Sequence, residues 1–233
     1  MKTNKRRTRR GLPLILGGLL LIAAALSLTG YNLWDDARAE RAKREILTEL
    51  VPEIPEGILP PDSMQQAVMA QRSTAEAQAA EVQLPQMEVR YPYYMLDETM
   101  KMPVKTVNGF DYVATLQIPR LGLELPVMQE WNYERLQYSP CRYEGTPYLH
   151  NMVICAHNYQ SHFGRNNSLK AGDAVILTDM DGNVFRYEVA EVETLEPTAV
   201  DEMTNGEWAL TLFTCTVGGQ YRVTVRCNEL SSQ

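Results

Sequence analysis

Beyond its first ten residues, this 233-residue chain has no patch of basic residues. Those ten residues contain six lysines and arginines and no acidic residue. The whole chain nevertheless has a formal net charge of −7, so everything after the tenth residue is markedly acidic. Nucleic-acid binding needs a basic surface that neutralises phosphates. The charge distribution therefore argues against a nucleic-acid partner.

Histidine is also scarce, with only His150, His157 and His162 in the chain. Neither these three residues nor the four cysteines have the spacing of a zinc site. The acidic residues between 179 and 183 are typical of a hairpin turn and do not make a full calcium loop. We therefore expect no metal and no cofactor. The small number of histidines leaves few candidates for a catalytic base.

Charge is absent between Arg10 and Asp35, where the sequence is almost wholly apolar. Residues 11–33 are enough to cross a bilayer as a helix. Tyr31 and Trp34 follow where interfacial aromatic residues are common, and the preceding basic residues favour a cytoplasmic N-terminus. We expect a single-pass anchor in the cell membrane. A cleavable signal peptide is the alternative, although this apolar run is long for one, and both interpretations place the bulk of the chain outside the cytoplasm.

The segment after the apolar run is charged and helix-prone up to residue 50, and four prolines follow between residues 52 and 61. Prolines interrupt helices and favour extended chain. From Val107 the sequence changes to short strand-like runs separated by turns. We therefore divide the chain into a basic cytoplasmic tail (1–10), a transmembrane anchor (11–33), an extracytoplasmic stalk or linker (34–106) and a catalytic domain (107–233).

Eight short strands are predicted in the catalytic domain, with short helical pieces at 131–137 and around 161–169. The strands are expected at 111–118, 123–128, 143–145, 152–157, 173–179, 184–194, 209–215 and 221–227. So many short strands in about half of the chain indicate an all-β domain built as a small closed barrel.

A possible nucleophile lies at the end of one of these strands. Cys215 closes an apolar, β-branched run, and Arg222 opens the next run after a Gly-Gly turn, so the two strands are expected to return antiparallel. His157 follows another apolar run that starts at residue 151. A thiol nucleophile needs a base and a partner for developing negative charge, and these residues could supply both.

Each of these residues has a competing interpretation. A cysteine at a strand end is most often a small buried hydrophobic residue. His162 is the main rival of His157, and Arg226 shares the strand face of Arg222 but lies further from Cys215.

Taken together, these residues resemble the sortase family of cysteine transpeptidases. The family's TLxTC motif is matched by Thr211–Cys215, its strand-opening arginine by Arg222, and its histidine by His157. The segment 116–127 and the pair Gly172-Asp173 also look alike. The similarity extends from Val107 to the C-terminus, about half of the chain.

The resemblance implies an eight-stranded barrel and cleavage of a C-terminal LPXTG-like sorting signal. The thioacyl intermediate would pass to an amine of a cell-wall precursor, a pilin or another surface protein, at a Gram-positive cell surface. Pilus-polymerising members usually have a lid with an Asp-Pro-aromatic motif and often a second membrane helix. Neither is seen here, so we expect anchoring of proteins to the wall.

The resemblance also points to substrate-binding residues. In sortases, the loop that corresponds to residues 194–207 lines the groove for the signal, so Ala199, Val200 and Met203 are candidates, although they could also pack against the barrel. Thr214, beside the nucleophile, is a fourth candidate.

Two other functions use the same sequence features. A thiol peptidase would resolve the acyl-enzyme with water, and a non-catalytic surface module would only bind partners. If Cys215 is a free thiol, Cys141, Cys155 and Cys227 allow at most one disulfide, and the sequence does not choose among the three pairings.

Overall fold

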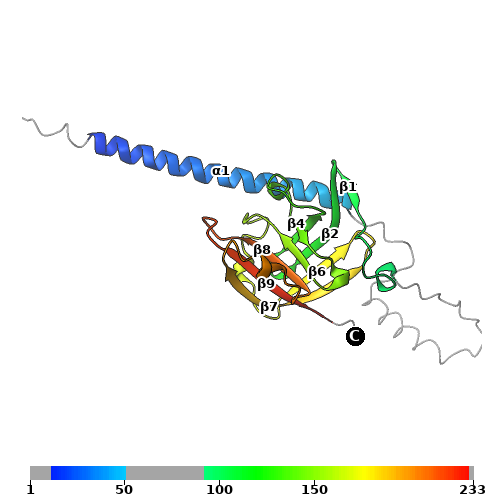
Figure 1. Cartoon of the computed structure of the whole chain (residues 1–233). Coiled ribbons are helices and arrows are strands. Elements are labelled where there is room, and N and C mark those ends of the chain that lie inside the picture. The colour runs from blue at the N-terminus through cyan, green and yellow to red at the C-terminus, as the bar shows by residue number, and fades with distance from the viewer. Residues whose placement is uncertain (1–11, 51–91, 231–233) are drawn as a thin grey trace, which may run out of the picture.

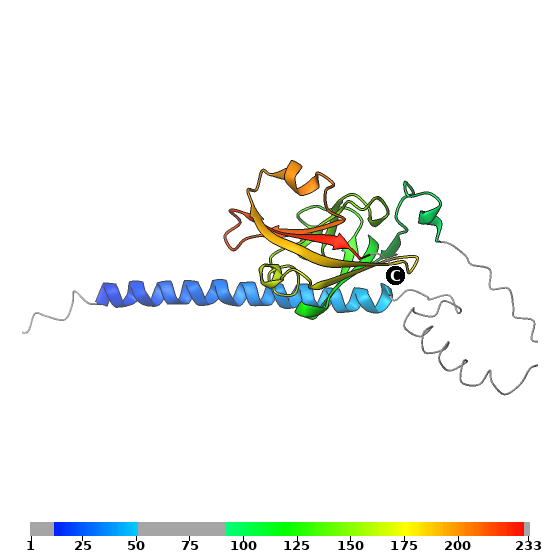
Figure 2. The same ribbon diagram turned by 90° about the horizontal axis from the view of Figure 1, so that it is seen from below.

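The computed structural model of the chain describes residues 12–50 and 92–230 (Figure 1). The expected basic tail at 1–10 and the part of the expected stalk at 51–91 lie outside the described residues. A long helix, α1 (Leu12–Leu50), lies along one side of a β-barrel, and Figure 2 shows the same arrangement from below.

Nine strands form one sheet. They are β1 (Lys105–Val107), β2 (Phe110–Ile118), β3 (Leu123–Met128), β4 (Cys141–Glu144), β5 (Met152–Cys155), β6 (Ala174–Asp179), β7 (Val184–Leu195), β8 (Leu210–Cys215) and β9 (Arg222–Glu229).

The sheet closes on itself. The strand order is β1-β2-β3-β4-β5-β8-β9-β7-β6, and β2 also pairs with β6. The eight strands β2 to β9 therefore form a closed barrel, and β1 is an additional strand on the outer edge of β2. This confirms the predicted eight-stranded barrel, and each predicted strand has a counterpart close to its expected ends. Strand β1 was not predicted because three residues are too few to show an alternating pattern.

Short helices precede or connect the strands. They are the 3-10 turns η1 (Tyr93–Met95), η2 (Pro119–Leu121), η3 (Arg135–Gln137), η4 (Pro147–Leu149) and η5 (Asn166–Ser168), and the α-helix α3 (Val200–Thr204). The helical pieces expected at 131–137 and 161–169 correspond to η3 and η5. Helix α3 falls in the loop between β7 and β8, where no helix was expected.

Alternate residues of β8 point to opposite faces of the sheet. Leu210 and Leu212 belong to the larger apolar cluster, which fills the barrel, whereas Phe213 belongs to a second cluster on the other face. The second cluster also contains Ile46 and Leu50 of α1. Helix α1 therefore packs on the outer face of the sheet that Phe213 occupies.

The first half of α1 has a different character from the second. An 18-residue window within it has a mean hydropathy of 2.1 and no buried residue, so the helix could cross a membrane by its length and composition. The second half packs on the barrel, and Met102 and Tyr94 also contact the barrel core. Parts of the segment expected as a stalk thus touch the barrel, and the division of the chain into a stalk and a catalytic domain stays a prediction.

All four cysteines are free thiols. Cys141 lies opposite Cys155 across β4 and β5, and Cys227 lies at the far end of β9 from Arg222. Burial raises the pKa of Cys141 and of Cys227 to about 12 each, so these thiols stay protonated and unreactive.

Candidate active site

Cys215 is the last residue of β8, and it is the one residue of that strand that is not fully buried. Five buried residues precede it, so the apolar strand fixes the position of Cys215 at its C-terminal end while this residue stays partly exposed. Cys215 shares strand parity with Phe213, which places its side chain on the outer face of the sheet.

Arg222 begins β9 directly opposite Cys215 in the antiparallel register. Residues that face each other in this way have their Cβ atoms about 5 Å apart and point to the same side. The Nη1 of Arg222 donates hydrogen bonds to the carbonyl oxygens of Gly219 and Tyr221, both at 3.2 Å. Within the described residues the guanidinium has no ion pair with a carboxylate. Its remaining N–H groups are therefore not committed to an acidic partner.

His157 follows β5, which runs parallel to β8 with Cys155 beside Phe213. Two hydrogen bonds extend this pairing beyond the strands. The N–H of Ala156 donates to the carbonyl oxygen of Phe213 at 3.2 Å, and the Thr214 hydroxyl donates to the Ala156 carbonyl oxygen at 2.8 Å. The residues directly after β5 are thereby held next to the exit of β8, where Cys215 lies.

The loop that starts at His157 has a further tie to the β8 exit. Asn158 Nδ2 donates to the carbonyl oxygen of Thr216 at 3.5 Å. Because Thr214 is buried and its hydroxyl is used internally, its contribution in this structure is to join the two strand ends. Its assignment as a substrate residue stays a prediction.

The ring of Tyr159 and the carboxylate of Asp35, a residue of α1, influence His157. Its imidazole stacks on Tyr159 with 4.8 Å between ring centroids, and the Tyr159 hydroxyl donates to Asp35 Oδ2 at 2.5 Å. Burial lowers the pKa of His157 below its ordinary value, and the Asp35 carboxylate offsets part of this effect. The burial favours a neutral imidazole, which can accept a proton.

The rival residues are engaged elsewhere. His162 is fully buried, neither of its ring nitrogens has a hydrogen-bond partner among the described residues, and burial lowers its pKa to about 4. His150 is exposed and pairs with Glu229. Arg226 is buried, with its Nε 2.7 Å from Glu193 Oε1. His150 and Arg226 thus have carboxylate partners of their own, and His162 is a buried neighbour of Tyr159.

The substrate-binding candidates in the β7–β8 connection occupy different environments. Ala199 lines a cavity of about 330 Å³, which is also lined by Thr194, Leu195, Glu196, Glu202 and Tyr221. Val200 is exposed, whereas Met203 is buried in the outer apolar cluster. The cavity reaches Tyr221, the neighbour of Arg222, and thus borders the end of the sheet that carries the candidate site.

Asp35, Tyr159 and Tyr221 are the residues near the site that sequence reasoning did not single out. Asp35 is the first charged residue after the apolar run, but no local pattern could show that it contacts a residue 124 positions later. Within the described part of the chain, no group of three or more His, Cys, Asp or Glu residues could hold a metal ion.

Comparison with known proteins gives a family match. The Sortase domain model matches residues 116–230. No curated protein matches the chain.

Several solved structures are similar to the chain. A Clostridium perfringens sortase D5 transpeptidase is 22% identical, with 55% of this chain and 83% of that chain covered and a TM-score of 0.46. The sortase E1 of Streptomyces coelicolor, solved with a tripeptide in its active site, is 20% identical, with 52% and 88% covered and a TM-score of 0.46. A Clostridium perfringens sortase C, solved with the C-terminal cell wall sorting motif, is 22% identical, with 51% and 70% covered and a TM-score of 0.44.

Proposed function

Because this chain belongs to the sortase family through residues 116–230, we propose that it is a cysteine transpeptidase with Cys215 as its nucleophile. The observation that carries this proposal is the position of Cys215, which lies opposite Arg222 on β9 and beside the exit of β5, from which His157 emerges. Sorting-signal peptides are the substrate class that this family membership supports.

In the proposed first half-reaction, the Cys215 sulfur attacks a peptide carbonyl carbon of the substrate. The carbon–sulfur bond forms, the carbon–nitrogen bond breaks, and the product is a thioester on Cys215. His157 first takes the proton of the Cys215 thiol, and the imidazolium formed in this way then gives that proton to the leaving amine. In the second half-reaction, an incoming amine attacks the thioester and gives a proton to His157. The new carbon–nitrogen bond forms, the carbon–sulfur bond breaks, and the Cys215 sulfur takes the proton back from His157.

Arg222 is proposed to stabilise the negative charge on the substrate oxygen. This charge develops as the sulfur adds to the carbonyl carbon, and a guanidinium N–H is a strong donor to such an oxygen. The guanidinium is held at the strand end by two backbone carbonyls, so little reorganisation is needed for this role.

The finer details of the substrate are also proposals. The signal is expected to be LPXTG-like and cleaved after the threonine, with Ala199, Val200, Met203 and Thr214 as candidate contact residues. The acyl acceptor is expected to be an amine on a cell-wall precursor or a surface protein.

Helix α1 is proposed to anchor the enzyme in the membrane, with its N-terminus in the cytoplasm and the barrel outside.

Product analysis tests the proposal. The full-length enzyme is incubated with a sorting peptide, with and without an added amine, and the products are identified by mass spectrometry. We expect an amide-linked transfer product only when the amine is present. Cys215→Ala should abolish turnover, whereas Cys227→Ala, which removes a buried thiol at the other end of β9, should retain it. Hydrolysis that the amine does not change would favour the thiol peptidase, and a folded wild type without turnover would favour the binding module.

A further inference from the structure

Helix α1 changes from fully exposed to partly buried at a single point. Its side chains from residue 13 to Trp34 are exposed on every side. From there on, a stripe of buried residues at helical spacing faces the barrel. The stripe consists of Asp35, Ala39, Lys43, Ile46 and Leu50. The contact with the barrel thus begins at the first charged residue after the apolar run.

Polar contacts fix this junction. The Tyr159 hydroxyl donates to Asp35, and the backbone N–H of Ser161 donates to Asp36 Oδ1 at 3.0 Å. Arg38 lies over the ring of Tyr138, with its Cζ 5.6 Å from the ring centroid. Ile46 and Leu50 add apolar packing three to four turns further along the helix. The barrel is therefore held along α1 with a defined orientation, and no spacer separates it from the apolar half.

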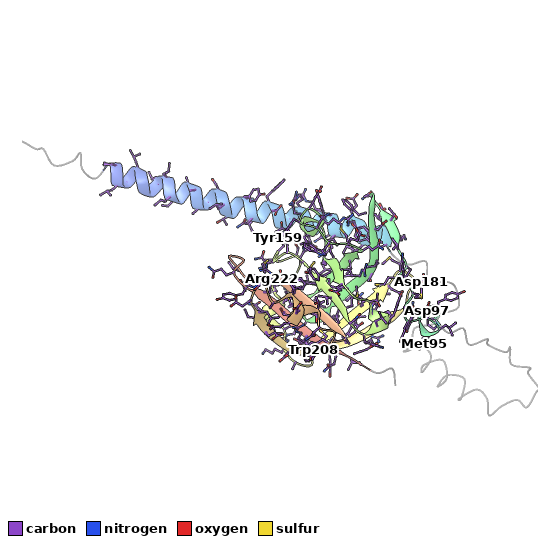
Figure 3. All side chains as sticks on the ribbon, viewed as in Figure 1. Met95, Asp97, Tyr159, Asp181, Trp208 and Arg222 are labelled. Atoms are coloured by element: carbon purple, nitrogen blue, oxygen red, sulfur yellow. The ribbon has the colours of Figure 1, made fainter. Side chains whose placement is uncertain are left out.

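The end of the barrel nearest the apolar half of α1 carries the candidate site. Tyr159 belongs to the loop that follows His157, and Figure 3 shows Tyr159 and Arg222 toward this end, with Asp97 and Asp181 toward the opposite end. In both ribbon views, the red β8–β9 loop points along α1 toward its N-terminal half (Figures 1 and 2). This loop joins Cys215 to Arg222.

The β8–β9 loop differs in charge from the opposite end of the barrel. The β8–β9 loop, Thr216–Tyr221, has no charged residue, and its Val217 side chain is 98% exposed. Tyr221, an amphipathic residue suited to a bilayer interface, is 42% exposed. The opposite end has the exposed acidic residues Asp97, Glu98 and Asp181. An anionic bilayer would repel the acidic end and would tolerate the uncharged loop.

From these observations we propose that the barrel lies directly on the outer surface of the bilayer, with the β8–β9 loop in contact with lipid through Val217 and Tyr221. This inference rests on the proposed membrane anchor and catalytic function. It adds a location to both, because the barrel end that carries Cys215 would then face the lipid headgroups. The site would be placed to act on peptides and amine acceptors that are themselves tethered in the membrane.

Photo-crosslinking tests the lipid contact. A photo-reactive amino acid replaces Val217 in the full chain, which is reconstituted into vesicles of phosphatidylcholine and phosphatidylglycerol in equal parts. The matched control carries the same amino acid in place of Val184, which is 50% exposed near Asp181 at the opposite end. We expect crosslinks to phospholipid from position 217 and several-fold fewer from position 184. Equal crosslinking from both positions, or none from position 217, would overturn the proposal.

A helical insertion tests the functional consequence. Seven helix-forming residues between Leu33 and Trp34 would lift the barrel by about 10 Å, at about 1.5 Å per residue. Seven residues make almost two full turns, so the side of α1 that packs on the barrel is rotated by only about 20°. We expect unchanged turnover of a soluble sorting peptide and at least a tenfold loss with the same peptide carried on a membrane-spanning helix.

The outcomes of the insertion experiment are separable. If the insertion variant and the wild type process the membrane-tethered peptide equally, the proposed placement at the bilayer is wrong while the catalytic function stands. If neither protein processes the soluble peptide, the proposed function itself fails.

Discussion

His157 is surrounded by groups that shift its ionisation in opposite directions. Burial lowers its pKa, and the carboxylate of Asp35, which bonds the stacked Tyr159, raises it again in part. Proton donation to the leaving amine requires the imidazolium, whose population falls as the pH rises through the pKa. A lowered pKa of His157 therefore shifts the decline of activity with rising pH to lower pH values.

Replacing Asp35 tests this balance. In Asp35→Asn, the charge that favours the imidazolium is lost, so the pKa of His157 should fall further. NMR titration of the imidazole should give a midpoint below about 6.5 in the wild type and a lower one in the variant. Asp36→Asn, which removes the neighbouring carboxylate charge while its amide oxygen can still accept from Ser161, is the matched control and should leave the midpoint unchanged. A higher midpoint in Asp35→Asn would contradict the account.

His162 should make the fold sensitive to acid. Its folded pKa of about 4 lies below its unfolded value of about 6.5, so the unfolded state binds more protons in this window. The stability is fully present above the unfolded pKa and is lost as the pH falls toward about 4, by on the order of 3 kcal/mol. Urea denaturation between neutral pH and pH 4 should show this loss in the wild type and a smaller one in His162→Leu. The loss should persist in His150→Asn, since His150 is exposed; an equal loss in His162→Leu would argue against the assignment.

Among the elements, α1 combines an apolar half with a half that packs on the barrel. Leu50 is 1% exposed and packs in the same outer cluster as Phe213 of β8. Helix α1 therefore packs in the same apolar cluster as β8, the strand that carries Cys215.

Leu50→Ala measures the strength of this packing. Truncating a fully buried leucine costs about 2–5 kcal/mol, since apolar contact is lost and a cavity remains. The free energy of unfolding of the detergent-solubilised chain should fall by that amount, whereas the neighbouring exposed Glu49→Ala should change it little. Equal stability of the two variants would mean that α1 is not part of the folded unit.

At the scale of the whole molecule, the barrel was predictable because its strands are marked by local patterns. The alternation around Leu116 and the Asp-Gly turn near residue 181 are local signals, and the strand boundaries followed from them. The pairing of Cys215 with Arg222 also followed, because a short Gly-Gly turn forces the strands to return side by side.

The docking of α1 on the barrel could not be predicted in the same way. It depends on contacts such as Asp35 with Tyr159 and Asp36 with Ser161, which join residues more than a hundred positions apart. The charged segment after Trp34 has the composition of a solvated helix, so it was expected to act as a stalk. Its buried stripe is recognisable only once the barrel surface that covers it is known. The roles of His157, Cys215 and Arg222 stay predictions for experiment.

The measurement that tests the central claim most directly is the site of acylation. The full-length enzyme is incubated with a panel of sorting peptides without an amine acceptor, quenched in acid, digested and examined by mass spectrometry. The account predicts a thioester on Cys215 that disappears when an amine is added. An adduct on Cys141, Cys155 or Cys227 in place of Cys215 would contradict it.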